Sequence, residues 1–140
     1  MIIVDTNLLV RIIVDDEPKQ VKIAKEILKK DQVYIPKTVF LELGWILESV
    51  YNLEKHKILM ALNALLEPEN IVVEDMPQIR QSLQWYANGM QFADALHLST
   101  AFGSVNEFAT FDKKLIKKSS KHPHHDWRPH ISNASELISQ

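Results

Sequence analysis

Four acidic side chains stand at places in the chain where a carboxylate can do chemistry. Asp5 directly follows a short apolar run and precedes residues at helical spacing, and Asp112 directly follows a second strand-like run. Glu42 lies on or beside the apolar stripe of a predicted helix, and Asp94 is the single charge of a short, largely apolar helix. Because Asp is also a favoured helix N-cap, Asp5 taken alone is explained equally well by capping and by a site.

Four carboxylates gathered in one cleft require counter-charge, because like charges at short range cannot all stay ionised. Hard oxygen ligands select Mg²⁺ or Mn²⁺, and such a site can activate water and stabilise an in-line displacement at phosphorus. Two polar residues near these acids have a structural alternative: Thr110 could be an ordinary strand threonine, and His97 a histidine packed in the core. The polar residues that could orient ligands or position water are Thr6, Asn7, His97 and Thr110.

The order of elements predicts how these acids come together. Apolar runs at 2–4, 33–35, 71–73 and 107–111 predict strands, and amphipathic spacings between them predict helices. A parallel sheet with right-handed crossovers places the carboxyl ends of all strands on one edge, where ligands bind. Asp75 also follows a strand, but in a 3-2-1-4 order it would be remote from the cleft and is given no role.

Local signals set the expected helix boundaries. Pro18 suits a first helical position, Thr38 is a plausible N-cap, and Asn88-Gly89 breaks a helix. Gly103 is predicted as a C-cap, and the final segment from His122 to Pro129 is predicted to be a loop. The buried stripe of the helix that carries Glu42 is predicted to be Val39, Leu43, Ile46, Leu47 and Val50.

Composition favours a single domain. The chain has 140 residues, 46% of them hydrophobic, and no cysteine, so disulfides and thiolate metal sites are excluded. Charged residues interrupt the apolar N-terminus, which argues against a signal peptide or membrane span and favours a cytoplasmic protein. The net charge of −2 conceals an uneven distribution, because residues 113–130 hold six basic residues against one acidic residue.

The motifs together resemble the PIN-domain superfamily and, within it, the VapC-type toxin ribonucleases of toxin–antitoxin systems. The resemblance rests on Val4-Asp5-Thr6-Asn7, on Glu42 in its apolar helix, on Phe92 to His97, and on Thr110-Phe111-Asp112. It implies an α/β fold, a three-layer α/β/α domain with a parallel sheet of four to five strands in the order 3-2-1-4-5. Residues 1–140 would form this single domain, with about 119–140 as a basic, His-containing C-terminal segment.

The resemblance also implies an activity and partners. The family's metal-binding and catalytic acids fall on Asp5, Glu42, Asp94 and Asp112, which would hold Mg²⁺ or Mn²⁺ for hydrolysis of RNA phosphodiester bonds. A cognate antitoxin and a homodimer or higher homo-oligomer are the implied protein partners. Candidate RNA contacts are Lys113, Lys114, Lys117 and Arg128.

Two features depart from the family pattern. Lys113 and Lys114 occupy the region where some relatives offer a further acid, which puts a second metal in question. The tail from His122 to His130 could bind a transition metal, contact RNA together with the lysines, or be a solvated loop.

Three other functions compete with the ribonuclease. A degenerate PIN scaffold would bind RNA or protein without cleaving, although the intact set of four acids argues against it. A haloacid-dehalogenase-like phosphatase needs a second Asp where Asn7 stands. A phospho-acceptor receiver domain would leave Glu42 and Asp94 unexplained.

Overall fold

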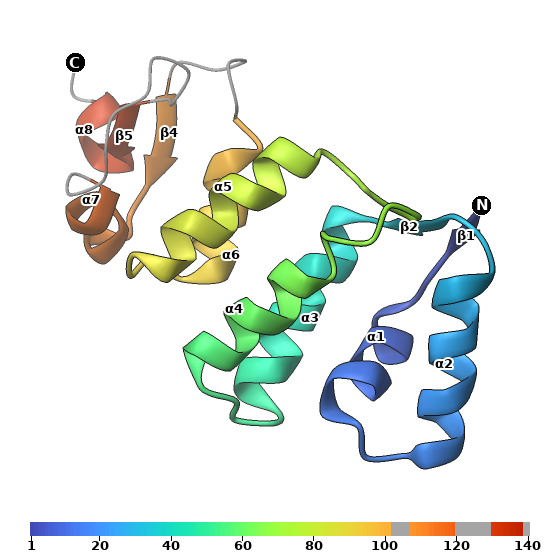
Figure 1. Cartoon of the computed structure of the whole chain (residues 1–140). Helices are drawn as coiled ribbons and strands as arrows, with labels where there is room; N and C mark the ends of the chain where they lie inside the picture. The colour runs from blue at the N-terminus through green and yellow to red at the C-terminus, as the bar shows by residue number, and fades with distance from the viewer. Residues whose placement is uncertain (102–106, 120–129, 139–140) are drawn as a thin grey trace. The chain divides into compact units, whose positions relative to one another are not determined.

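The structure of the protein is a computed structural model. The chain forms two compact units, Met1–Met76 and Pro77–Gln140. It describes residues 1–101, 107–119 and 130–138. The sequence predictions for Gly103, for Arg128 and for most of the His-containing tail therefore lie outside the described residues. Figure 1 shows the helices and strands of both units.

The first unit is built on three short parallel strands. Its strands are adjacent in the order β1-β2-β3, with Ile2 opposite Val33 and Val33 opposite Ile71. Its elements are β1 (Ile2–Ile3), α1 (Thr6–Val14), α2 (Pro18–Lys30), β2 (Val33–Ile35), α3 (Lys37–Ser49), α4 (Lys55–Ala64) and β3 (Ile71–Val73).

Alternating burial explains why these strands form. Val33 and Ile35 of β2 are fully buried on one side of the backbone, and Ile71 and Val73 repeat the pattern in β3. Helix α1 packs against α2 and α3, and α3 packs against α4 (Figure 1). The prediction that Pro18 begins a helix is confirmed, because Pro18 is the first residue of α2.

Helix α3 differs from the sequence prediction in two respects. It begins at Lys37 after Pro36, so the prediction of Thr38 as N-cap is wrong. Its buried face consists of Phe40, Leu43, Gly44 and Leu47, whereas Val50, assigned to the buried stripe, is 57% exposed. Apolar residues lie on most sides of this helix, so the periodicity of the sequence allows either of two neighbouring faces to be the buried one. The structure buries the face that carries the large Phe40 ring.

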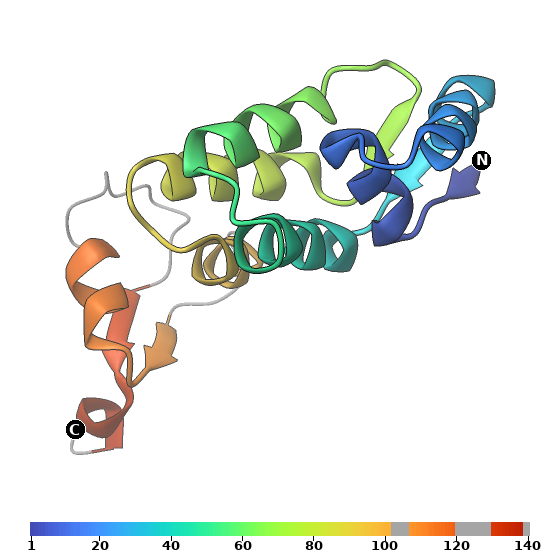
Figure 2. The same ribbon diagram turned by 90° about the horizontal axis from the view of Figure 1, so that it is seen from below.

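The described part of the second unit combines four helices with a pair of parallel strands. The strands β4 and β5 pair from Glu107 opposite His130 to Thr110 opposite Asn133 (Figure 2). Its elements are α5 (Met76–Ala87), α6 (Phe92–Ser99), β4 (Glu107–Thr110), α7 (Lys113–Ser119), β5 (His130–Asn133) and α8 (Ala134–Ile138).

A separate apolar core holds this unit together. Its buried members are Trp85, Met90, Ala95, Leu98, Leu115 and Ile131, from α5 through β5. A buried hydrogen bond links α5 to α6, because the Ser82 hydroxyl donates to Ser99 Oγ at 2.9 Å. Gly89, with a φ of 111°, ends the turn after α5, as the Asn88-Gly89 break predicted.

The predicted loop from His122 to Pro129 lies outside the described residues, and the residues after it form the strand β5 (His130–Asn133), which no local pattern predicted. Only Ile131 of its four residues is buried, so the apolar periodicity that reveals a strand is nearly absent. The α/β class with parallel strands is confirmed, as are the neighbours 3-2-1 and 4-5. The pairing of strand 1 with strand 4 stays a prediction. Among the described residues, no helix has the length and apolar composition needed to cross a membrane.

Candidate active site

Asp5 lies at the carboxyl end of β1, at the first turn of α1. Its backbone is extended, and its Oδ1 accepts a hydrogen bond from the Thr6 N–H at 2.7 Å. A capping aspartate normally accepts from the second or third N–H of the helix, so this contact orients the carboxylate without completing a standard cap. The side chain remains exposed, and Asp5 is therefore available to a ligand.

The two residues after Asp5 have different surroundings. Thr6 is 1% exposed and belongs to the packed interior of the first unit. Asn7 is exposed and lines a small hollow between α1 and α2. Of this pair, Asn7 is the residue that can contact a ligand or a water molecule.

Glu42 lies in the second turn of α3, which follows β2. Its side chain is exposed beside the buried face of α3, so of the two predicted positions, on or beside the apolar stripe, the second is confirmed. It has no hydrogen bond or ion pair to any described residue. Because β1 and β2 are parallel neighbours and α1 packs on α3, Asp5 and Glu42 both follow strand ends on the same edge of the first unit.

Asp94 and Asp112 form the acidic pair of the second unit. Asp94 lies in the first turn of α6 and is half-buried. Burial, followed by the negative charge of Asp112, raises the pKa of Asp94, while His97 and Lys118 act in the opposite direction. The two carboxylates are therefore close enough to repel each other.

Asp112 is held by the backbone of the helix it precedes. Its Oδ1 accepts hydrogen bonds from the N–H groups of Lys114 at 2.9 Å and Leu115 at 3.1 Å, the arrangement of a helix N-cap. The Thr110 hydroxyl oxygen accepts from the Asp112 N–H at 3.0 Å. Thr110 thus orders the turn that presents Asp112, which is a specific contact rather than that of an ordinary strand threonine.

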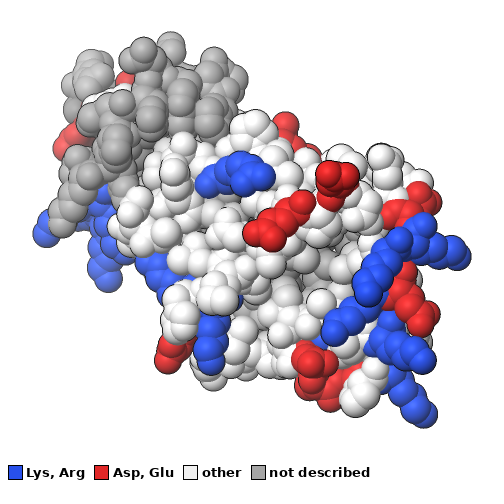
Figure 3. All heavy atoms as spheres, in the orientation of Figure 1, with Lys and Arg blue, Asp and Glu red and all other residues white. Residues whose placement is uncertain are grey.

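The remaining candidates surround this acidic pair. His97 is exposed on α6, so the alternative of a packed core histidine is wrong. The predicted RNA contacts Lys113, Lys114 and Lys117 are exposed on α7, and Figure 3 shows basic side chains gathered there and over α2.

Asp75 has a structural partner of its own. Its Oδ2 lies 2.7 Å from Lys37 Nζ, and its φ of 50° places it in the tight turn after β3. This ion pair joins the end of β3 to the start of α3. It explains the position of Asp75 without any role in binding a ligand.

The donor chemistry of the four acids fits a divalent cation. All four offer hard carboxylate oxygens, and the mutual repulsion of Asp94 and Asp112 is the kind that Mg²⁺ or Mn²⁺ relieves. Among the described residues of each unit, no three acids or histidines lie close enough together to hold a metal ion. Each unit contributes one pair, and the convergence of the two pairs stays a prediction.

Comparison with known families identifies the fold. The model of the PIN domain family matches residues 2–121, which include all four acids, and the chain belongs to this family. PIN domains are generally nucleases, and they typically bind divalent metals. No curated protein and no solved structure matches the chain.

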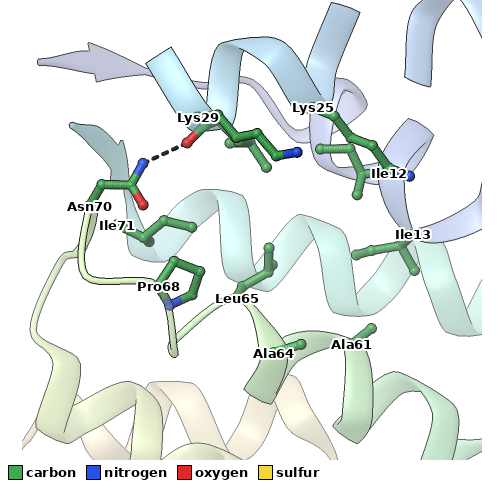
Figure 4. A pocket seen from close by; sticks show the side chains of 11 residues that line it. Ile12, Ile13, Lys25, Lys29, Ala61, Ala64, Leu65, Pro68, Asn70 and Ile71 are labelled. Atoms are coloured by element: carbon green, nitrogen blue, oxygen red, sulfur yellow. Dashed lines mark hydrogen bonds between the residues drawn. The ribbon is translucent and has the colours of Figure 1, made fainter. Parts of the chain in front are cut away.

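Sequence reasoning missed an apolar groove on the first unit. It has a volume of about 540 Å³ and lies between α1, α2, α4 and the start of β3 (Figure 4). Its apolar lining comes from segments far apart in the sequence, including Ile12, Ile13 and Leu65, with Lys25 and Lys29 on its α2 side. These isoleucines look like ordinary core residues in the sequence, so no sequence signal distinguishes the groove.

Proposed function

We propose that this protein is a divalent-metal-dependent endoribonuclease, the toxin of a VapBC-type pair, in which Asp5, Glu42, Asp94 and Asp112 hold Mg²⁺ or Mn²⁺. The observation that carries the proposal is the PIN family match across the segment that contains all four acids. When bound, the metal would supply Lewis-acid stabilisation of phosphoryl charge and an activated water.

The protein's own residues prepare the acids for this role. Backbone N–H groups fix one oxygen of Asp5 and one of Asp112, which limits the orientations that each carboxylate can adopt. Thr110 orders the turn before α7. These fixed positions lower the entropic cost of gathering ligands around a cation.

Lysines on α7 support RNA as the substrate. Phosphate backbones bind to positive charge, and the chain as a whole is slightly acidic. Lys113, Lys114 and Lys117 are exposed directly after the acidic Asp112, where they can attract a phosphate strand toward the acids. Arg128 is a further candidate contact on the ground of its charge and lies outside the described residues.

The apolar groove supports a protein partner. An antitoxin segment that presents aliphatic side chains would fill it, and acidic side chains on its flank would meet Lys25 and Lys29, which lie one turn apart on α2. The small Ala61 and Ala64 on α4 would let a helix approach closely.

A second copy of the chain is the other proposed partner. Trp45 on α3, Val50 directly after α3 and Met60 on α4 are large apolar side chains that are more than half exposed. Such residues favour an interface between copies. Light scattering on the purified chain, with and without Trp45→Arg, tests this part of the proposal.

Sequencing of RNA ends after induced expression tests the activity. Asp5→Asn keeps the size and an acceptor oxygen at the Thr6 N–H but removes the charge, so cleavage and growth inhibition should both disappear. Asp75→Asn is the matched control, because Asp75 pairs with Lys37, and this variant should cleave normally. Undiminished cleavage by Asp5→Asn would refute the assignment.

The alternative is a PIN scaffold that binds RNA or protein without cleaving it. Neither unit holds a group of three metal-binding side chains among its described residues, and since each unit supplies only two of the four acids, this observation agrees with both functions. Titration with Mg²⁺ and Mn²⁺ separates the two functions, because only the nuclease should gain thermal stability with either ion. An unchanged melting temperature at millimolar metal would support the scaffold.

A further inference from the structure

A small hollow between α1 and α2 lies beside the proposed nuclease site, and Asn7 is the one of its lining residues that is also a candidate for that site. It has a volume of about 220 Å³, and we call it the α1–α2 hollow. Its lining residues are Asn7, Leu8, Arg11, Gln20, Ile23 and Ala24, all in the first unit. Because α1 rises 1.5 Å per residue, the Asn7 end of the hollow begins about 3 Å along the helix from Asp5.

The polar groups in this hollow suit a neutral, planar ligand better than a phosphate. The Arg11 guanidinium already donates to Asp16 Oδ1 at 2.7 Å and to the Tyr51 hydroxyl at 2.6 Å, so two of its N–H groups are engaged and Asp16 offsets part of its charge. The side-chain amides of Asn7 and Gln20 have no hydrogen-bond partner among the described residues. An amide offers a donor and an acceptor side by side, which matches the edge of a nucleobase.

The apolar walls of the hollow point to the same class of ligand. Ile23 is 58% exposed on α2, although an amphipathic helix normally places isoleucine on its buried face. It lies one turn after Gln20, and with Leu8 opposite it borders the hollow. A base ring set between Ile23 and Leu8 would cover this exposed apolar surface.

The size of the hollow fits one such ring. Complete small-molecule sites are about 300–1,000 Å³, so 220 Å³ accommodates a fragment of a larger ligand rather than a whole one. A strand of RNA bound at Asp5 would supply that fragment as the base of a neighbouring nucleotide.

We propose that the α1–α2 hollow binds the base of a nucleotide flanking the cleaved bond, with Gln20 contacting its edge and Ile23 its face. This inference rests on the proposed ribonuclease function and adds a determinant of cleavage-site specificity. Gln20 and Ile23 are specificity residues, and neither takes part in holding the metal.

The test compares cleavage of a randomised RNA pool by the full chain and by the Gln20→Ala and Ile23→Ala variants. The wild-type chain should show a base preference at one position beside the cut. Gln20→Ala should reduce this preference by roughly 5- to 100-fold, the discrimination that edge contacts provide. Ile23→Ala should reduce it by a smaller factor, because a contact to the face of the base distinguishes bases mainly by size. Gln20→Glu, which replaces the amide donor by an acceptor, should shift the preference toward bases that donate. Gln81→Ala on α5, outside the hollow, is the matched control and should keep the wild-type preference.

Binding gives a second measurement that does not depend on cleavage. The Asp5→Asn chain, with and without Gln20→Ala, is used to select bound RNAs from the same pool, which are then sequenced. A base preference that disappears with Gln20→Ala supports the inference, whereas an unchanged preference overturns it.

The two proposals fail in different ways. If the wild-type chain cleaves and the hollow variants keep its preference, the hollow is not a base site and the ribonuclease stands. If the wild-type chain cleaves nothing, the proposed function fails, and the bound RNAs alone decide whether the hollow selects a base.

Discussion

Replacing Asp94 by Asn should raise the free energy of unfolding relative to the wild-type chain when no metal is present, and lower it relative to the wild-type chain when metal is bound. Burial and the charge of Asp112 raise the pKa of Asp94 above its ordinary value of 3.8, so its ionised form is disfavoured in the folded protein. The Asp94 carboxylate makes no hydrogen bond to a described residue, and asparagine keeps its shape. Without metal at pH 7, Asp94→Asn should therefore be more stable than the wild-type chain.

The magnitude follows from the position of the side chain. Asp94 is only half-buried, so solvent screens the repulsion, and the gain should be about 0.5 kcal/mol, or about 2 °C in melting temperature. A raised folded pKa means that wild-type stability falls as pH rises above 3.8. The advantage of Asp94→Asn should accordingly vanish below about pH 3.8, where the wild-type carboxyl is protonated in both folded and unfolded states.

Metal should reverse this order. At ten times its dissociation constant, Mg²⁺ stabilises a protein that binds it by about 1.4 kcal/mol, or about 5 °C. The wild-type chain should gain this amount, and Asp94→Asn should gain much less because it lacks one ligand charge.

Calorimetry of both proteins across a Mg²⁺ titration, in parallel at pH 7 and in acid, measures all three effects. Glu48→Gln, which removes an exposed acid without a described ion pair, controls for net charge. The reasoning is refuted if Asp94→Asn is less stable than wild type in the absence of metal, or if both proteins gain equally from Mg²⁺.

Three further predictions concern separate parts of the second unit. Removing Lys113 or Lys114 should weaken RNA binding equally for all sequences and lower the slope of log affinity against log salt by about 0.7 each, as fluorescence anisotropy would show; an unchanged slope would exclude the lysine as a phosphate contact. Leu98→Ala should cost about 2–5 kcal/mol in urea denaturation, because the side chain is fully buried in the core, and a cost below 1 kcal/mol would contradict that packing. Asp112→Ala should lose about 1 kcal/mol with the cap of α7, whereas Asp112→Asn should keep most stability and lose cleavage; equal activity in Asp112→Asn and wild type would remove Asp112 from the site.

The strands of the first unit illustrate what sequence can predict. The bounds of β2 and β3 agree with the apolar runs 33–35 and 71–73. Both runs consist of β-branched and aromatic residues, which favour strands. β5 could not be predicted in this way. His130–Asn133 is mostly polar, and its place beside β4 comes from pairing with a distant segment and from a single buried isoleucine.

The candidate site was predictable in its positions and less so in its surroundings. Asp5 and Asp112 follow strands and begin helices as expected, because strand ends and caps leave local signals. The exposure of Glu42 depends on which face of α3 packs, and an apolar helix offers more than one face to choose from. The coupling of Asp94 to Asp112 depends on tertiary proximity between α6 and the start of α7, which no local pattern encodes.

The central claim is that Asp5 serves a metal-dependent ribonuclease. The most direct measurement is cleavage of total RNA by the purified chain and by Asp5→Asn, with Mg²⁺, with Mn²⁺ and with excess chelator. We expect discrete new RNA ends only from the wild-type chain with metal, and none from Asp5→Asn under any condition. Cleavage that persists in chelator, or in Asp5→Asn with metal, would contradict the claim.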